Sequence, residues 1–126
     1  MIWTLAQVAL GGAIGAVARF LTVHAALRAF GPGFPWGTLA VNVVGSFLMG
    51  LLFVWLEARG LMRLAPFLMA GVLGGFTTFS AFSLDVLKLW EGGAVAQAGA
   101  YAGASVMLSV LGLVAGVAVM RAVCAG

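Results

Sequence analysis

Four long apolar stretches, each close to the length of a membrane-spanning helix, dominate this sequence. They cover residues of about 2–27, 36–56, 64–84 and 94–120, and short polar or Gly/Pro-containing connections separate them. A helix needs roughly 20 apolar residues to cross a bilayer. Charged residues make up only 7% of the chain, whereas soluble domains carry about 25%. The chain is therefore predicted to be an all-α integral membrane protein.

The four stretches leave no room for a soluble domain, so we expect a single transmembrane domain over residues 1–126. The expected helices cover residues of about 2–28, 35–57, 64–86 and 94–122. No basic segment precedes the first stretch, which favours a retained helix over a cleaved signal peptide. The basic residues form no cluster of the kind that binds nucleic acid. We therefore expect a multi-pass protein of the cell membrane, surrounded by lipid and without a nucleic-acid partner.

Basic residues are spread almost evenly over the two expected sides of the membrane. One side carries three and the other two or three, namely Arg59, Arg63 and Arg121 against Arg28, Lys88 and Arg19. Such a balance gives almost no positive-inside signal. We therefore hypothesise that the chain inserts in both orientations and that two copies pair antiparallel.

Glycines four residues apart recur in three of the four stretches. The pairs are Gly11/Gly15, Gly71/Gly75, Gly99/Gly103 and Gly112/Gly116. This spacing lets the backbones of two membrane helices approach closely. We expect tight packing within one subunit and also across a dimer interface.

The third stretch contains a segment, GVLGGFTTFSAF at residues 71–82, that is a poor helix former. We expect the helix to unwind around Gly74 and Gly75, within residues 74–80. Carbonyl groups freed inside a bilayer need partners, and converging carbonyls can hold a monovalent cation. Phe79 and Phe82 follow the break at i, i+3. Their ring edges carry partial positive charge that an anion can contact, although packing alone could also explain two phenylalanines.

Uncharged polar residues in the second and fourth stretches add hydrogen-bond donors at membrane depth. Asn42 lies one turn after Thr38, and Tyr101, Ser105 and Ser109 form a stripe at i, i+4, i+8. Asn42 could instead join two helices, and each serine could bond its own backbone. Three donors in register nevertheless favour a lined ion path.

Arg19 is the one basic residue well inside a stretch, and it has no carboxylate partner in its own helix. It is interpreted either as an anchor that reaches the membrane surface or as part of an electropositive vestibule. The acidic residues, including Asp85, are expected at helix ends or in connections, in contact with water. Because no carboxylate is expected at membrane depth, the pattern favours an anion over a cation or a proton-coupled substrate.

Three segments resemble the signature stretches of the Fluc/CrcB fluoride channels, in the same order along the chain. They read GGAIGAVARF at 11–20, GTLAVNVVGSFLMG at 37–50 and GVLGGFTTFSAF at 71–82. The resemblance covers essentially the whole chain. It implies a passive, non-enzymatic fluoride-selective channel that exports toxic fluoride across the cell membrane. It also implies a dual-topology antiparallel homodimer with two pores.

The same resemblance implies roles for individual residues. Phe79 and Phe82 match the aromatic pair that contacts fluoride, and Asn42 matches the pore asparagine. The hydroxyl-bearing residues implied to line the path are Thr38, Ser80, Ser83, Tyr101, Ser105 and Ser109. Arg19 matches the basic residue of the vestibule. Ala81 departs from the family, which more often has a hydroxyl-bearing residue there.

The resemblance further implies a structural sodium ion at the dimer interface. Its ligands would be the backbone carbonyls of Gly74 and Thr77, one set from each subunit. Two other functions remain open on the residues alone. A small dual-topology multidrug exporter would need a carboxylate in the first helix, and this chain has none there. A non-transporting membrane subunit would explain the glycines but not the polar stripe.

Overall fold

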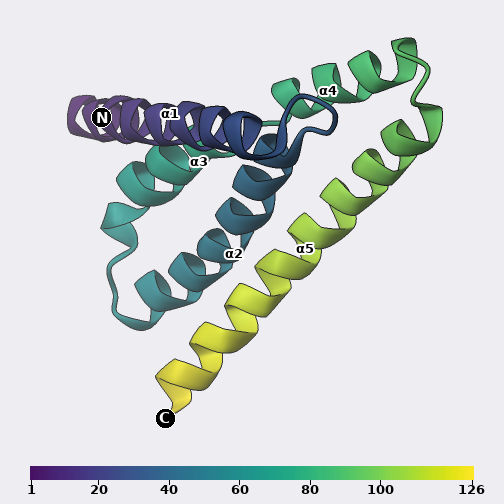
Figure 1. Cartoon of the computed structure of the whole chain (residues 1–126). Helices are drawn as coiled ribbons and strands as arrows, with labels where there is room; N and C mark the ends of the chain where they lie inside the picture. The colour runs from purple at the N-terminus through teal and green to yellow at the C-terminus, as the bar shows by residue number, and fades with distance from the viewer.

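The computed structural model describes all 126 residues, and every regular element in it is a helix (Figure 1). Four helical segments are long and apolar enough to cross a membrane, which confirms the predicted all-α membrane architecture. These segments are Ile2–Phe30, Trp36–Ala58, Met62–Glu91 and Val95–Ala125. The third therefore extends to Glu91, beyond the expected end near residue 86.

The first, second and fourth spans are continuous helices, whereas the third consists of several pieces. The continuous ones are α1 (Ile2–Phe30), α2 (Trp36–Ala58) and α5 (Val95–Ala125). The pieces of the third span are the 3-10 turn η1 (Met62–Leu64), the π-helix η2 (Pro66–Leu73), α3 (Gly74–Phe76) and α4 (Ser80–Glu91). Each connection between spans contains a glycine with positive φ, at Gly31, Gly60 and Gly93.

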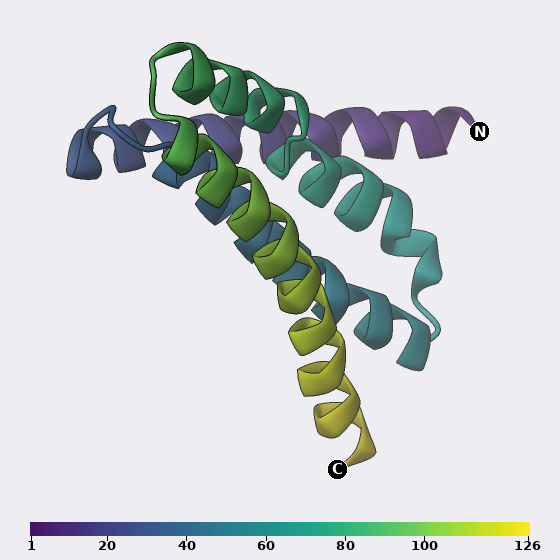
Figure 2. The same ribbon diagram turned by 90° about the vertical axis from the view of Figure 1, so that its right-hand side faces the viewer.

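Two helix pairs hold the subunit together, and glycines lie at both contacts. Figures 1 and 2 both show α2 and α5 side by side, and Gly50 and Gly116 lie directly against the backbone of the facing helix. α1 crosses η2 and α3, where Gly11 and Gly15 meet the segment that contains Gly71. A Cβ atom at any of these positions would overlap backbone atoms of the neighbouring helix. Close packing through glycine is thus confirmed within the subunit.

The glycine pair at the start of α5 behaves differently. Nothing in the subunit lies within 4 Å of the position that a Cβ atom would occupy on Gly99 or Gly103. Both residues therefore lie on an outer face of α5, and they contribute nothing to packing inside this subunit.

The third span is broken within residues 74–80, as expected, but not at the two glycines. Gly74 and Gly75 are helical members of α3, and the chain becomes extended only at Thr77, with φ −88° and ψ 157°. The expectation that the helix unwinds at Gly74 and Gly75 was therefore wrong, because the break begins two to three residues later, at Thr77. Gly75 is needed for close approach instead, because a Cβ atom on it would lie 2.6 Å from the carbonyl oxygen of Gly12, whereas one on Gly74 would meet only the carbonyl oxygen of Met69, at 3.5 Å.

Candidate functional site

The break between α3 and α4 removes several rungs of the helical hydrogen-bond ladder. The last regular rung before it joins the amide of Thr77 to the carbonyl of Leu73, and the first after it joins Ser83 to Phe79. The Thr77 hydroxyl also donates to the Leu73 carbonyl at 2.9 Å, which ends the upstream helix. Backbone groups inside a bilayer need other partners. Two side chains from other helices supply some of them.

Asn42 of α2 bonds to both backbone groups of Thr78. Its Nδ2 donates to the Thr78 carbonyl at 2.9 Å, and its Oδ1 accepts from the Thr78 amide at 2.8 Å. This pair also fixes which way the amide points, because only the oxygen can accept from a backbone N–H. Nδ2 carries a second N–H group that this pairing leaves available.

Arg19 of α1 bonds to a second group released by the break. Its Nε donates to the carbonyl of Gly75 at 3.0 Å, in place of the Phe79 amide that would reach this carbonyl in a continuous helix. Arg19 is half-buried, so its guanidinium is held beside the break rather than extended toward the membrane surface.

The carbonyls of Gly74 and Thr77 are left without such partners. The amide of Thr78, which would reach Gly74 in a helix, bonds to Asn42 instead. No hydrogen bond reaches the carbonyl oxygen of Thr77. Gly74 is exposed on the surface of the subunit. Together with the carbonyl oxygen of Phe76, which also receives no hydrogen bond, these two oxygens are free acceptors of the break. Neutral carbonyl oxygens are ligands that suit a hard monovalent cation.

A cavity of about 260 Å³ lies beside the break, between α2, α4 and α5. It is lined by Asn42, Ser46, Thr77, Thr78, Phe79, Phe82, Ser105, Val106, Ser109 and Val110. Five residues that the sequence singled out for an ion path thus share one cavity, namely Asn42, Phe79, Phe82, Ser105 and Ser109. We call it the pore cavity below.

The two phenylalanine rings form one wall of the pore cavity. Their centroids lie 5.4 Å apart and the ring planes are inclined by 54°. Phe82 is 8% exposed, whereas Phe79 is 75% exposed at the open side of the subunit. Tilted rings turn some C–H edges, which carry partial positive charge, toward the space between them.

Ser105 gives the pore cavity an unused hydrogen-bonding group. It is 5% exposed, and its Oγ atom has no hydrogen-bond partner. A buried hydroxyl without a partner costs free energy, so such groups mark places where a ligand or water completes the bonding. Ser105 and Asn42 both line this cavity, and a hydroxyl and an amide N–H are both groups that can donate to an anion.

Tyr101 and Thr38 lie beyond the pore cavity and are both buried. The ring of Tyr101 packs against Phe82 at a centroid distance of 5.2 Å with the ring planes inclined by 50°, and its hydroxyl donates to Asp85 Oδ2 at 3.0 Å. The expectation that Asp85 lies at a helix end or in a connection was wrong, because it lies inside α4, where it is half-buried. No local signal identified this pair, since its two residues are 16 positions apart in the sequence.

Three other residues assigned to the path or its vestibule do not line the pore cavity. Ser83 donates to the carbonyl of Phe79 at 2.9 Å, and the Ser80 hydroxyl lies 3.5 Å from that of Thr78. Both serines are exposed at the surface of the subunit. Arg19 lies on the α1 side of the break, bonded to Gly75. Ser46, which was not assigned to the path, does line the cavity.

Comparison with known proteins gives one consistent result. A family model described as "CrcB-like protein, Camphor Resistance (CrcB)" matches residues 6–117. A "Fluoride-specific ion channel FluC" of Cereibacter sphaeroides is 62% identical over 121 residues, covering 96% of this chain and 97% of the relative. Proteins of the same name in Ruegeria sp. and Rhizobium etli are 53% and 56% identical. The Ruegeria match covers 98% of both chains, and the Rhizobium match covers 91% of this chain and 94% of the relative.

Proposed function

The chain belongs to the CrcB-like family, and from that membership we propose that it is a passive, fluoride-selective ion channel of the cell membrane. The observation that carries this proposal is the pore cavity. It combines two tilted phenyl rings with the unpartnered hydroxyl of Ser105 and the free N–H of Asn42. Channels need several weak binding groups along the path, since one strong site would retain the ion.

Fluoride is small and holds its hydration water tightly, so a path through lipid has to offer replacement hydrogen-bond donors. The hydroxyls of Ser105 and Ser109 and the amide of Asn42 supply such donors at successive positions. The ring edges of Phe79 and Phe82 supply weaker contacts. None of the residues that line the pore cavity is ionised, so the cavity offers no group that would couple export to protons, and fluoride would move down its own gradient.

The openness of the pore cavity supports the antiparallel homodimer as the conducting form. Phe79 forms part of the cavity wall and is nevertheless 75% exposed in one subunit. A second subunit would close this side and exclude lipid from the path. The balanced basic residues are compatible with insertion in both orientations. A topology assay with a tag at each terminus should detect both termini on both sides of the membrane, and a single orientation would contradict this arrangement.

The free carbonyl groups at the break are suitable ligands for the structural sodium ion that the resemblance implies. The carbonyls of Gly74 and Thr77 lack hydrogen-bond donors, and no group of three or more acidic, His or Cys residues competes as a divalent metal site. When bound, sodium would supply a positive charge that the partially negative oxygens of the freed carbonyls could coordinate. Gly74 lies on the subunit surface, where a second copy could contribute matching oxygens. Sodium would then stabilise the dimer, so unfolding in detergent should require more denaturant in Na⁺ than in N-methylglucamine.

Fluoride efflux from proteoliposomes tests the channel function. Vesicles are loaded with KF, valinomycin starts the efflux, and a fluoride electrode records the fluoride released. Vesicles loaded with KCl and followed with a chloride electrode are the control for selectivity. We expect rapid efflux of fluoride and none of chloride. Efflux that requires an imposed proton or sodium gradient would point to a coupled transporter instead.

Two ring variants test the role of the cavity wall. Phe79→Ile and Phe82→Ile keep apolar bulk but remove the positive ring edge, so fluoride flux should fall by at least tenfold. Phe53→Ile is the matched control, because Phe53 lies on an exposed face of α2 outside the cavity. Normal flux in both cavity variants would show that the rings only pack.

A further inference from the structure

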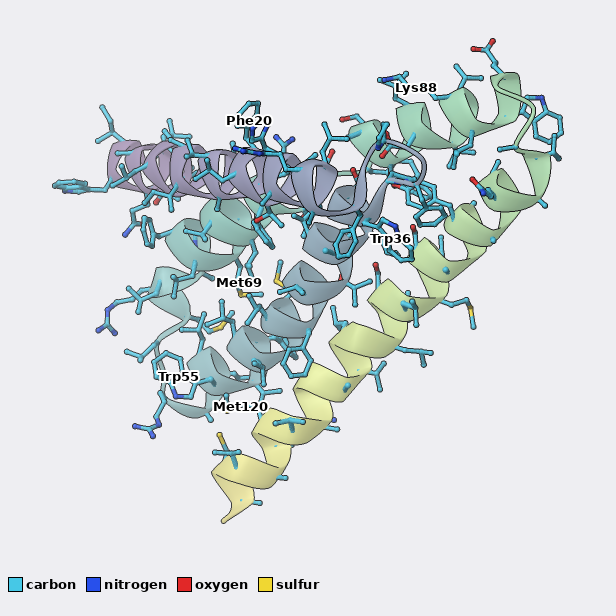
Figure 3. The ribbon with its side chains drawn as sticks, in the orientation of Figure 1. Phe20, Trp36, Trp55, Met69, Lys88 and Met120 are labelled. Atoms are coloured by element: carbon cyan, nitrogen blue, oxygen red, sulfur yellow. The ribbon has the colours of Figure 1, made fainter.

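A second cavity, of about 330 Å³, lies at the end of the subunit where α1 connects to α2. Its walls come from the end of α1, the connection at residues 31–35, the start of α2, and α4. The residues that matter for its chemistry are Phe34, Thr38, Asp85 and Lys88. We call it the outer cavity. Figure 3 shows Lys88 and Trp36, two of its lining residues, at this end of the molecule.

Tyr101 separates the outer cavity from the pore cavity. On one side its ring contacts Phe82, a wall residue of the pore cavity, at 5.2 Å. On the other side the ring of Phe34, a wall residue of the outer cavity, meets it edge-on at 5.4 Å and 85°. Its hydroxyl bonds to Asp85, which also faces the outer cavity. Tyr101 therefore lies between a wall residue of one cavity and a wall residue of the other.

The charges of the outer cavity decide which ions it admits. Asp85 and Lys88 are its two ionisable lining residues. Asp85 alone would repel an anion from a space walled mainly by apolar groups, where the field of a charge is weakly screened. Lys88 follows Asp85 by three positions on α4, so both lie on the same side of the helix. No ion pair joins them in the structure, and the exposed ammonium group remains able to act on an incoming ion.

We propose that the outer cavity is an entrance to the fluoride path and that Lys88 is the charge that draws the anion into it. This inference rests on the channel function proposed above. Lys88 offsets the repulsion from Asp85 and raises the local concentration of fluoride beside Thr38 and Tyr101. A cleft lined by one sign of charge can raise the rate of arrival of an oppositely charged ion by 10-fold or more at low salt, and the effect of Lys88 should be smaller because Asp85 carries the opposite charge.

The test compares initial fluoride efflux at two ionic strengths, set by an impermeant salt. Lys88→Gln should reduce the rate about three- to tenfold at ~10 mM, where the Debye length is about 30 Å, and hardly at all at ~1 M, where it is about 3 Å. Lys88→Arg keeps the charge and should restore the parent rate at both ionic strengths. Arg121→Gln removes the same charge from a residue of α5 that lines neither cavity, and it should behave like the parent.

Other results would overturn the inference. Equal rates for Lys88→Gln and the parent at ~10 mM ionic strength would show that Lys88 does not steer fluoride. A loss of the same size at both ionic strengths, not restored by Lys88→Arg, would assign Lys88 a packing role. Failure of the channel function itself is seen separately, as the absence of fluoride efflux from the parent protein, and the inference would fall with it.

Discussion

Asn42 completes, through two hydrogen bonds to Thr78, the backbone bonding that the break in the third span interrupts. The amide of Thr78 and its carbonyl would each belong to a different rung of a continuous helix. A single carboxamide satisfies both, because it carries one acceptor and two donors on adjacent atoms. Asn42 also lines the pore cavity, so the residue that stabilises the break also presents a donor to the ion path.

Asn42→Leu should therefore impair both stability and conduction. The variant leaves a backbone N–H and C=O unsatisfied, and each such group costs about 1–3 kcal/mol. Unfolding by SDS in mixed micelles should show this loss, and fluoride efflux should fall with it. Ser46→Ala is the matched control, since Ser46 lines the same cavity but makes no side-chain hydrogen bond. If Asn42→Leu unfolds at the same SDS concentration as Ser46→Ala, the pairing does not stabilise the break.

Asn42→Asp separates the two roles of this residue. Aspartate can still accept from the Thr78 amide but cannot donate to the Thr78 carbonyl, and it brings a negative charge into the pore cavity. Fluoride flux should be lost more completely than in Asn42→Leu, while stability falls less. The reverse order would indicate that Asn42 acts on conduction only through the fold.

Arg19 makes the other hydrogen bond from a side chain to a carbonyl freed by the break, to Gly75 at 3.0 Å. Arg19→Met should destabilise the protein by about 1.5–3 kcal/mol, the usual range for a hydrogen bond to a charged group. Arg28→Met is the control, because Arg28 is exposed on the same helix and makes no hydrogen bond through its side chain. Arg19→Lys keeps the charge, so normal flux with reduced stability would show that conduction depends on charge and stability on guanidinium geometry.

The sequence predicted the spans well because a membrane helix is defined by length and apolarity alone, both of which are local properties. The site at Phe79 and Phe82 was also predictable, since the helix-breaking residues before these rings are contiguous in the chain. The position of the break was not, because it depends on Asn42 from another helix. A Gly-Gly pair suggests an unwound segment, but here Gly75 is small so that α1 can pass close by.

The environment of Asp85 also could not be predicted from the local sequence. A carboxylate near the end of an apolar stretch is usually in contact with water, and local composition gives no reason to expect otherwise. Its burial follows from the path of α5, which brings the hydroxyl of Tyr101 to 3.0 Å from it. Contacts of this kind become visible only when the packing of α4 against α5 is known.

The bond between Tyr101 and Asp85 should be measurable as an energetic coupling. Tyr101→Phe removes the hydroxyl but keeps the ring contacts with Phe34 and Phe82. In a double-mutant cycle with Asp85→Ala, the free energies of unfolding should deviate from additivity by about 1.5–3 kcal/mol, as expected for a hydrogen bond to a charged group. Additive effects would mean that the two residues contribute independently. Repeating the cycle with Val86→Ala, a neighbour of Asp85 on α4, should give no coupling.

Two glycines on α1, three residues apart, provide the sharpest test of helix packing. A Cβ atom on Gly15 would overlap the backbone of Val72 and lie 2.8 Å from the amide nitrogen of Phe76, whereas one on Gly12 meets nothing within 4 Å. Gly15→Ala should therefore force α1 away from the third span. That movement would strain the bond from Arg19 to Gly75, so both stability and fluoride flux should fall.

Gly12→Ala should have the opposite effect on stability. Alanine favours a helix over glycine by about 1 kcal/mol, and here nothing opposes the added methyl group. Unfolding by SDS of the two variants and the parent, followed by fluoride efflux, compares the same chemical change at two positions of one helix. If Gly15→Ala is as stable as Gly12→Ala, the close approach of α1 to η2 and α3 is not what holds the break in place.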